Sequence, residues 1–309
     1  VMISASHNPC EYNGIKIFQK NGYKLDDAIE EEIENIILND SEEIPVKLGG
    51  EVGNRVYCKT ALSDYVSHVI STASVRFDGM TIALDCANGS ASVCAKDIFT
   101  GLGAKCIMLS DTPDGENINL KCGSTHPEEL MHFVKNASLD LGLAFDGDAD
   151  RMLAVDENGE LVDGDKVIAI CSQRLKNEGR LAKNTAVVTV MSNMGFFKFC
   201  KENGIDCAKT AVGDRYVLER MIKEGYNIGG EQSGHIIFLD DNTTGDGLLS
   251  ALQLLKVMTD TGSKLSELAE IMEVLPQALV NAKVPNHKKE HYMDYAEIAE
   301  AVKSLEEKF

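Results

Sequence analysis

Three aspartates at alternate positions, followed directly by an arginine, are the residues of this sequence best suited to chemistry. They lie in the segment Asp146-Gly147-Asp148-Ala149-Asp150-Arg151. Hard cations such as Mg²⁺ prefer oxygen ligands, and a turning backbone can bring carboxylates at every second position to one point. Arg151 indicates that the partner of such an ion is an anion. We therefore predict a divalent-cation site at Asp146, Asp148 and Asp150.

Three other interpretations fit parts of this segment. An acidic turn that only solubilises a strand end would explain a single Asp-x-Asp pair, but it is a poor explanation for three aspartates followed by Arg151. A calcium-binding EF-hand loop fits the aspartate spacing and would place Glu157 at its twelfth position, but Arg151 stands where that loop requires glycine. An aspartyl nucleophile of the haloacid-dehalogenase type at Asp146 would also follow a strand. That pattern, however, usually carries Thr or Val at the position of Asp150.

A second polar cluster, Ser4-Ala5-Ser6-His7-Asn8-Pro9, follows a short apolar segment. Because proline disfavours helix at the residue before it, the cluster is expected to form a tight loop after a strand. A plain turn is the alternative. Ser6 beside His7 would suit a nucleophile and its base, but adjacent side chains seldom point the same way, so we do not predict a hydrolase dyad. Lys16, in the next expected strand, can reach back toward this loop.

A third polar loop, Gly230-Glu231-Gln232-Ser233-Gly234-His235, lies between two expected strands. Its side chains suit hydrogen bonding to sugar hydroxyls, and a hairpin turn that binds nothing is the alternative. Upstream, Asp214 and Arg215 open a helix whose positive N-terminal end could meet an anion or a hydroxyl.

Alternating strands and helices must position these loops. The apolar run 139–145 predicts a buried strand that ends at the aspartates, where α/β folds place ligands. Further strand and helix pairs over 81–109 and from about 163 to 210 predict two layered α/β units. A strand at 278–284 and a helix at 295–308 are expected to begin a last domain.

The charge balance excludes some partners. The chain has 309 residues, with 30 Lys plus Arg against 49 Asp plus Glu, so its formal net charge is −19. Nucleic acid and anionic membrane surfaces are therefore not expected as partners. The nine cysteines are never spaced as Cys-x-x-Cys, which indicates reduced thiols in a cytoplasmic protein. No apolar run approaches the roughly 20 residues that span a bilayer.

The order of the three loops resembles the α-D-phosphohexomutase superfamily. The serine loop with Asn13-Gly14-Ile15-Lys16, the aspartate segment and the 230–235 loop follow one another as in that family. The resemblance covers essentially the whole chain. Within the superfamily the sequence is most similar to the branch of bacterial phosphoglucosamine mutases, because Gln232 and the lead-in Ile3-Ser4-Ala5-Ser6 match it.

The resemblance implies a fold of three similar α/β domains around a central cleft, plus a smaller α+β fourth domain. On this chain it implies the following division: the C-terminal part of domain 1 at 1–60, domain 2 at 61–162, domain 3 at 163–276 and the beginning of domain 4 at 277–309. The family's arginine-containing segment near its start and its Arg-x-Ser-Gly-Thr phosphate loop are both missing. We therefore expect a fragment that turns over poorly by itself, since nothing clamps the distal phosphate.

The resemblance also implies a role for each site residue. Ser6 would carry the phosphoryl group, and His7, Lys16 and Arg151 would support its transfer. One Mg²⁺ per chain would have four ligands: Asp146, Asp148, Asp150 and an oxygen on Ser6. The sugar-binding residues would be Asp214, Arg215, Glu231, Ser233 and His235.

The implied reaction interconverts glucosamine 6-phosphate and glucosamine 1-phosphate through a 1,6-bisphosphate, for UDP-N-acetylglucosamine and peptidoglycan precursors. Glucosamine 1,6-bisphosphate or a similar compound would act as activator. The partner is then a small hexosamine phosphate, and a homodimer is left open. Two alternatives are a phosphoglucomutase/phosphomannomutase of the same superfamily and a sugar-phosphate or cation-binding protein without catalysis. A methionine in place of Gln232 would have favoured the first of these.

Overall fold

The computed structural model describes residues 1–39, 46–278, 280 and 283–308. The chain divides into two compact units, Val1–Leu275 and Pro276–Phe309. The second unit contains a 3₁₀ segment, Asn286–Asp294, and helix α10, Ala296–Lys308. The strand expected at 278–284 falls partly outside the described residues, and those described in that range are not in a strand. Within the described part of the chain, no helix is long and apolar enough to cross a membrane.

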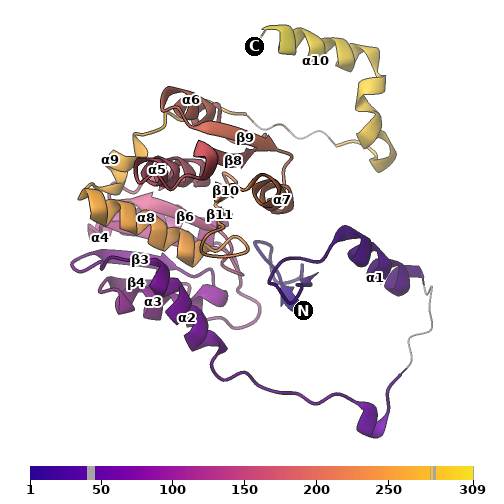
Figure 1. The fold of residues 1–309 in the computed structure, drawn as a ribbon, viewed down its shortest axis with the longest axis horizontal. Helices are drawn as coiled ribbons and strands as arrows, with labels where there is room; N and C mark the ends of the chain where they lie inside the picture. The colour runs from indigo at the N-terminus through magenta and orange to yellow at the C-terminus, as the bar shows by residue number, and fades with distance from the viewer. Residues whose placement is uncertain (40–45, 279, 281–282, 309) are drawn as a thin grey trace. The chain divides into compact units, whose positions relative to one another are not determined.

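The first sheet of the larger unit is mixed and lies among helices α2, Ala61–Thr72, α3, Ala95–Gly101, and α4, Glu128–Ala137 (Figure 1). Its strands in spatial order are β4 (Lys105–Leu109), β3 (Thr81–Asp85), β5 (Leu141–Phe145), β6 (Met152–Asp156) and β7 (Leu161–Val162). Strands β4, β3 and β5 run parallel to one another, whereas β6 is antiparallel to β5 and β7 is antiparallel to β6. All five residues of β5 are buried, as expected for a continuous apolar run in a central strand.

The second sheet repeats this plan with four strands. In spatial order they are β11 (Ile236–Phe238), β10 (Ile228–Gly230), β8 (Thr185–Thr189) and β9 (Asp206–Thr210). Only β11 runs antiparallel to its neighbour. The helices of this part are α5 (Gly164–Asn177), α6 (Met194–Glu202), α7 (Asp214–Glu224), α8 (Gly247–Thr261) and α9 (Leu265–Ala269).

Aspartate caps fix where two of these helices begin. Asp163 accepts a hydrogen bond from the Lys166 amide at the start of α5, and Asp246 accepts one from the Leu249 amide at the start of α8. Each cap satisfies an amide that has no partner within its helix, which stabilises the helix by about 1 kcal/mol. Because α8 packs against both α5 and strand β6, one buried apolar cluster extends over both sheets. The loops at the sheet ends are therefore held close to one another.

The N-terminal segment is a two-stranded antiparallel hairpin followed by a helix. Strands β1 (Met2–Ser4) and β2 (Gly14–Lys16) pair with Ser4 opposite Gly14. Helix α1 covers Asp27–Asn39. The serine loop lies between the two strands.

Candidate active site

The three predicted metal ligands meet directly after strand β5. One carboxylate oxygen from each of Asp146, Asp148 and Asp150 lies within 4.8 Å of the other two. Each aspartate also has one buried oxygen without a hydrogen-bond partner. Buried carboxylate oxygens are costly when unpaired, and an oxygen-preferring divalent cation would satisfy all three at once. The donor set therefore fits Mg²⁺.

Electrostatics within the cluster separate the aspartates. Burial, and then the charges of Asp150 and Asp148, raise the pKa of Asp146 well above its usual value. Burial alone would also raise the pKa of Asp150, but the ion pair with His235, together with Lys16, lowers it. Three carboxylates at this spacing repel one another unless cations lie among them. The Lys16 ammonium supplies one positive charge, 2.6 Å from Asp148 and 3.2 Å from Asp150.

The predicted serine loop lies against this cluster. The Ser6 amide donates to Ser4 Oγ at 2.8 Å, and Ser4 Oγ in turn donates to Asp148 at 3.0 Å. Ser6 has φ 51°, a left-handed conformation that non-glycine residues seldom adopt and that often marks functional sites. Its hydroxyl lies 3.3 Å from His7 Nδ1. The expectation that these adjacent side chains point apart was wrong, because the left-handed turn at Ser6 folds them together.

A glycine lets the serine loop and the aspartate loop touch. The Gly147 amide donates to the Ser6 carbonyl at 3.2 Å. A Cβ at Gly147 would lie 2.5 Å from that carbonyl oxygen and 2.8 Å from Asn119 Nδ2. Both distances are far below van der Waals contact, so no larger residue fits without moving the serine loop.

Asn119 is a positioning residue that the sequence interpretation missed. Its side-chain amide donates to the carbonyls of Ser6 and Asn8, both at 2.8 Å, and the residue is buried. These bonds fix the loop from the side of the first sheet. The only signal in the sequence was its place in a Gly- and Asp-rich loop, which does not single it out. In the sequence, Ser4 likewise stands out only as part of the serine motif.

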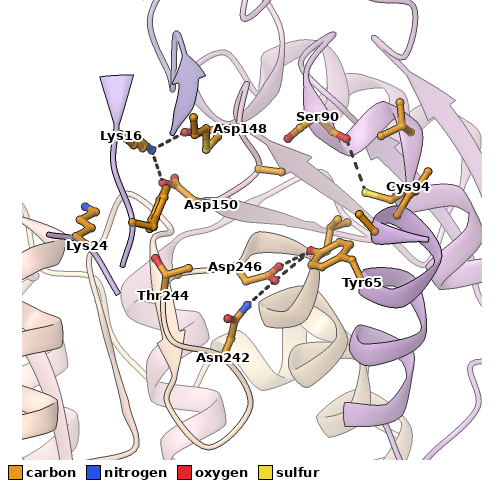
Figure 2. A pocket seen from close by; sticks show the side chains of 18 residues that line it. Lys16, Lys24, Tyr65, Ser90, Cys94, Asp148, Asp150, Asn242, Thr244 and Asp246 are labelled. Carbon is orange, nitrogen blue, oxygen red and sulfur yellow. Dashed lines mark hydrogen bonds and ion pairs between the residues drawn. The ribbon is translucent and has the colours of Figure 1, made fainter. Parts of the chain in front are cut away.

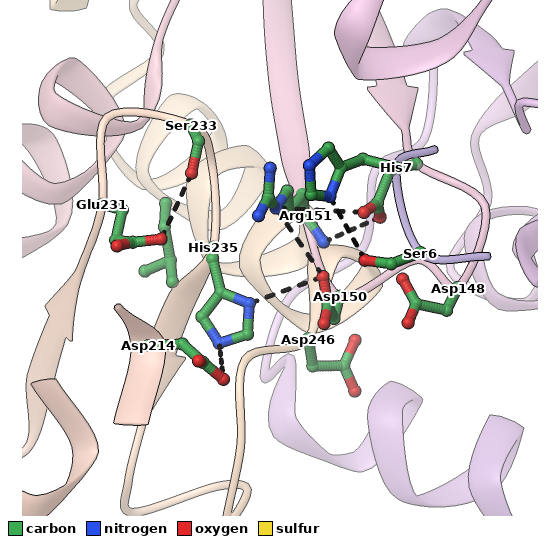
Figure 3. A network of polar contacts seen from close by, with 12 residues as sticks. Ser6, His7, Asp148, Asp150, Arg151, Asp214, Glu231, Ser233, His235 and Asp246 are labelled. Atoms are coloured by element: carbon green, nitrogen blue, oxygen red, sulfur yellow. Dashed lines mark hydrogen bonds and ion pairs between the residues drawn. The ribbon is translucent and has the colours of Figure 1, made fainter. Parts of the chain in front are cut away.

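The sugar-recognition loop joins the aspartate loop through the backbone. Arg151 and His235 form an antiparallel bridge, and the Met152 amide donates to the Gly234 carbonyl at 3.0 Å. His235 is 3% exposed, and its Nδ1 lies 3.5 Å from Asp150. Figure 3 shows Ser6, His7, Arg151 and His235 gathered around Asp150. The structure thus brings together residues from all three predicted loops.

The two other predicted sugar-binding residues of this loop, Glu231 and Ser233, precede His235 in the chain. Ser233 is exposed and its hydroxyl donates to Glu231 at 3.4 Å. Glu231 also accepts a hydrogen bond from the Gly213 amide at 3.0 Å. Gln232, in contrast, donates its side-chain amide to Asp163 at 3.1 Å, so it anchors the loop to the start of α5.

Arg151 keeps its guanidinium close to the cluster. Its Nε lies 3.9 Å from Asp146 and 4.0 Å from Asp150, and has no hydrogen-bond partner. The side chain is 23% exposed. A guanidinium that is oriented by carboxylates but not fully occupied can bind an oxyanion such as phosphate.

Asp214 and Arg215 are both engaged by the N-terminal segment. Lys24 forms an ion pair with Asp214, and Asp27 forms one with Arg215. Arg215 also lies 3.6 Å from Glu30 and 2.9 Å from Glu219. Asp214 remains close to the sugar loop, 3.8 Å from His235 Nε2.

Family comparisons cover most of the chain. Residues 1–44, 63–159 and 163–275 match, in order, alpha/beta/alpha domains I, II and III of phosphoglucomutase/phosphomannomutase. The phosphoglucosamine mutase of Clostridium novyi is 57% identical over 309 residues, which is 100% of this chain and 69% of that protein. The phosphoglucosamine mutase of Clostridium acetobutylicum is 56% identical over 307 residues, covering 99% and 68%.

Solved structures agree in fold. A phosphoglucomutase/phosphomannomutase family protein from Burkholderia thailandensis superposes with a TM-score of 0.74 at 23% identity, over 90% of this chain and 58% of that one. The Aspergillus fumigatus N-acetylphosphoglucosamine mutase superposes with a TM-score of 0.58 at 20% identity, over 72% and 54%. The chain thus spans less than two thirds of these two proteins. From the three domain matches and the relatives above 50% identity, the chain belongs to the phosphoglucomutase/phosphomannomutase family and, within it, to the phosphoglucosamine mutases.

Proposed function

We propose that the protein interconverts glucosamine 6-phosphate and glucosamine 1-phosphate through a phosphorylated Ser6 and a 1,6-bisphosphate. The observation that carries this proposal is the contact between the serine loop and the aspartate cluster, in which the Gly147 amide holds the Ser6 carbonyl at 3.2 Å. A hydroxyl that carries phosphate and a cation site that offsets its charge are the two parts that phosphoryl transfer needs. The identity with phosphoglucosamine mutases supports the amino-sugar substrate.

The proposed cycle moves one phosphoryl group at a time. The phosphate on Ser6 passes to the free hydroxyl of the sugar phosphate, which gives the 1,6-bisphosphate and a free Ser6 hydroxyl. After the bisphosphate reorients, its other phosphate returns to Ser6. Glucosamine 1,6-bisphosphate or a similar compound would serve as activator by phosphorylating Ser6 at the outset.

Cations around Ser6 would stabilise the charge in transit. Hydrogen bonds to Asp148 and Asp150 outweigh the effect of burial and raise the pKa of Lys16, so it stays protonated. Burial, and then the charge of Arg151, lower the pKa of His7, which leaves a neutral imidazole able to accept the Ser6 hydroxyl proton at Nδ1. The Lys16 ammonium and the Arg151 guanidinium would together provide the electrostatic stabilisation on which such reactions depend.

Mg²⁺ is the proposed cofactor. Asp146, Asp148 and Asp150 would hold it, with an oxygen on Ser6 as a further ligand, and their unpartnered oxygens support this assignment. When bound, the ion offsets negative charge on the phosphoryl group. The Aspergillus fumigatus relative is described in complex with GlcNAc-6P and magnesium. That description supports the same pairing of metal and sugar phosphate in this protein.

The sugar would be bound from the side of the second sheet. The proposed contacts are Glu231, Ser233 and His235, with Asp214 and Arg215 beside them. We further propose the domain division 1–60, 61–162, 163–276 and 277–309, a cytoplasmic location and a role in peptidoglycan precursor supply. A homodimer remains a proposal that light scattering would test.

Two measurements on the full-length protein test this function. After incubation with glucose 1,6-bisphosphate and Mg²⁺, mass spectrometry should find phosphate on Ser6, and Ser6→Ala should abolish turnover while the control Ser71→Ala does not. Absence of phosphate from Ser6 would favour a binding protein without catalysis. In parallel, kcat/KM should be higher for glucosamine 6-phosphate than for glucose 6-phosphate or mannose 6-phosphate. A preference for a neutral sugar would instead indicate a phosphoglucomutase or phosphomannomutase. Each tenfold difference in kcat/KM corresponds to about 1.4 kcal/mol of transition-state binding.

A further inference from the structure

A single hairpin of the N-terminal segment presents two lysines on one face. Phe18 and Lys24 form an antiparallel bridge, and the Gln19 amide donates to the Tyr23 carbonyl at 2.7 Å. Opposed residues in a strand pair, and those two positions away, point to the same side. Lys16, Phe18 and Lys24 therefore share a face, and all three line a cavity of about 510 Å³ (Figure 2).

The two lysines bind carboxylates on different parts of the fold. Lys16 holds Asp148 and Asp150 in the loop after β5 of the first sheet. Lys24 holds Asp214 at the start of α7, beside the second sheet. The hairpin thus fixes one part relative to the other through two ion pairs.

The two held carboxylates lie on opposite ring nitrogens of His235. Asp150 is 3.5 Å from Nδ1 and Asp214 is 3.8 Å from Nε2, which has no hydrogen-bond partner. Figure 3 shows the imidazole between these two aspartates. The ionisable groups therefore form a continuous row in the order Lys16, Asp150, His235, Asp214, Lys24. The two ends of this row come from one hairpin.

The segment at Asp214 has a second link to the sugar-recognition loop. Gly213, with φ 133° in a region that favours glycine, donates its amide to the Glu231 side chain at 3.0 Å. A shift of residues 213–214 would therefore move the neighbours of both Glu231 and His235. Only the pair with Lys24 ties Asp214 to the hairpin among the ion pairs of the described residues.

We propose that Lys24 is a positioning residue for sugar binding, which acts by holding Asp214 and through it His235 and Glu231. This inference rests on the proposed function of the 230–235 loop. The Lys24 and Asp214 side chains are each 31% exposed. A partly exposed ion pair contributes little to the stability of a fold, so its loss should change the geometry of the loop more than the stability of the protein.

Removing the Lys24 charge should weaken substrate binding selectively. In the full-length protein, Lys24→Met should raise KM for glucosamine 6-phosphate on the order of tenfold, since small misplacements of binding groups are costly. At saturating glucose 1,6-bisphosphate, phosphorylation of Ser6 should keep its wild-type maximal rate, because the ion pair of Lys24 is with Asp214 and not with the serine loop. Lys24→Arg should restore KM, and Lys20→Met, on the exposed turn of the same hairpin, should leave it unchanged.

Hydrogen exchange provides a readout that does not depend on activity. Without substrate, Lys24→Met should accelerate exchange of the Glu231 and Gly234 amides, which are hydrogen bonded within the loop. Asp214→Asn should accelerate exchange of the same amides. This variant replaces Lys24→Met in the test if Lys24→Met proves poorly folded. Wild-type exchange and wild-type KM in a folded Lys24→Met would overturn the proposal. Loss of Ser6 phosphorylation in this variant at saturating bisphosphate would overturn it too, by assigning Lys24 to phosphoryl transfer. An unphosphorylated wild-type Ser6 would instead refute the proposed function.

Discussion

His235 Nδ1 lies 3.5 Å from the carboxylate of Asp150, so the sugar-recognition loop and the cation site share a contact. The antiparallel backbone bridge between Arg151 and His235 holds the two loops at this distance. A substitution in one loop should consequently alter the geometry of the other.

Replacing this imidazole should impair catalysis strongly. His235 is 3% exposed, and His235→Asn keeps a polar group while removing the contacts of its ring with Asp150 and Asp214. We expect kcat/KM for glucosamine 6-phosphate to fall roughly 100-fold, since misplaced groups at a reacting centre have effects of this size. The exposed His132→Asn is the matched control. Equal kcat/KM for both variants would place His235 outside the site.

The aspartates should couple Mg²⁺ binding to stability. A ligand that binds only the folded state stabilises it by about 2.7 kcal/mol at a hundred times its Kd. The wild-type melting temperature should therefore rise with Mg²⁺, and Asp148→Asn should lose this rise. In the absence of metal, Asp146→Asn should melt higher than wild type, because burial and neighbouring carboxylates raise the pKa of Asp146. The exposed Asp206→Asn should retain the full response, and an equal response in all variants would contradict the site.

A buried aspartate away from the cleft should make stability depend on pH. Burial raises the pKa of Asp165 to about 6, from 3.8, and one of its oxygens has no hydrogen-bond partner. Between these values the folded state binds more protons than the unfolded state, so this group's contribution to the free energy of unfolding falls as pH rises from about 4 to 6.

Asp165→Asn, which stays neutral, should remove that dependence. The free energy of unfolding of the Asp165→Asn protein, minus that of the wild type, should increase by about 2 to 3 kcal/mol from pH 4 to pH 7. Each pKa unit corresponds to about 1.4 kcal/mol. Urea unfolding at both pH values measures this difference. A difference that does not vary with pH would show that Asp165 has an ordinary pKa.

Adding one methyl group at Gly147 should separate the two catalytic loops. Its Cβ would lie 2.5 Å from the Ser6 carbonyl oxygen, so Gly147→Ala must displace backbone. We expect a loss of about 1 to 3 kcal/mol in stability, as for other overpacking changes, and slower phosphorylation of Ser6. Gly53→Ala is the control, because no atom of the described residues lies within 4 Å of its added Cβ. Wild-type phosphorylation of the Gly147→Ala protein would refute the importance of this contact.

The sequence by itself determined the local features of this protein. The alternate aspartates after a buried strand, and the strands and helices around them, depend on neighbours within a few residues. Backbone geometry over such short spans is encoded by residue type and spacing. The family resemblance of the three loops, in their order, likewise depends on residue type and spacing alone.

The tertiary structure alone decided which distant groups meet. Asn119 bonds to Ser6 across 113 positions, and Lys24 to Asp214 across 190. No local pattern selects such partners, because they depend on how the sheets and the hairpin pack together. The left-handed turn at Ser6, which brings its hydroxyl to His7, is also held by bonds from other loops. The loops were therefore predictable one by one, whereas their assembly into a site required the fold.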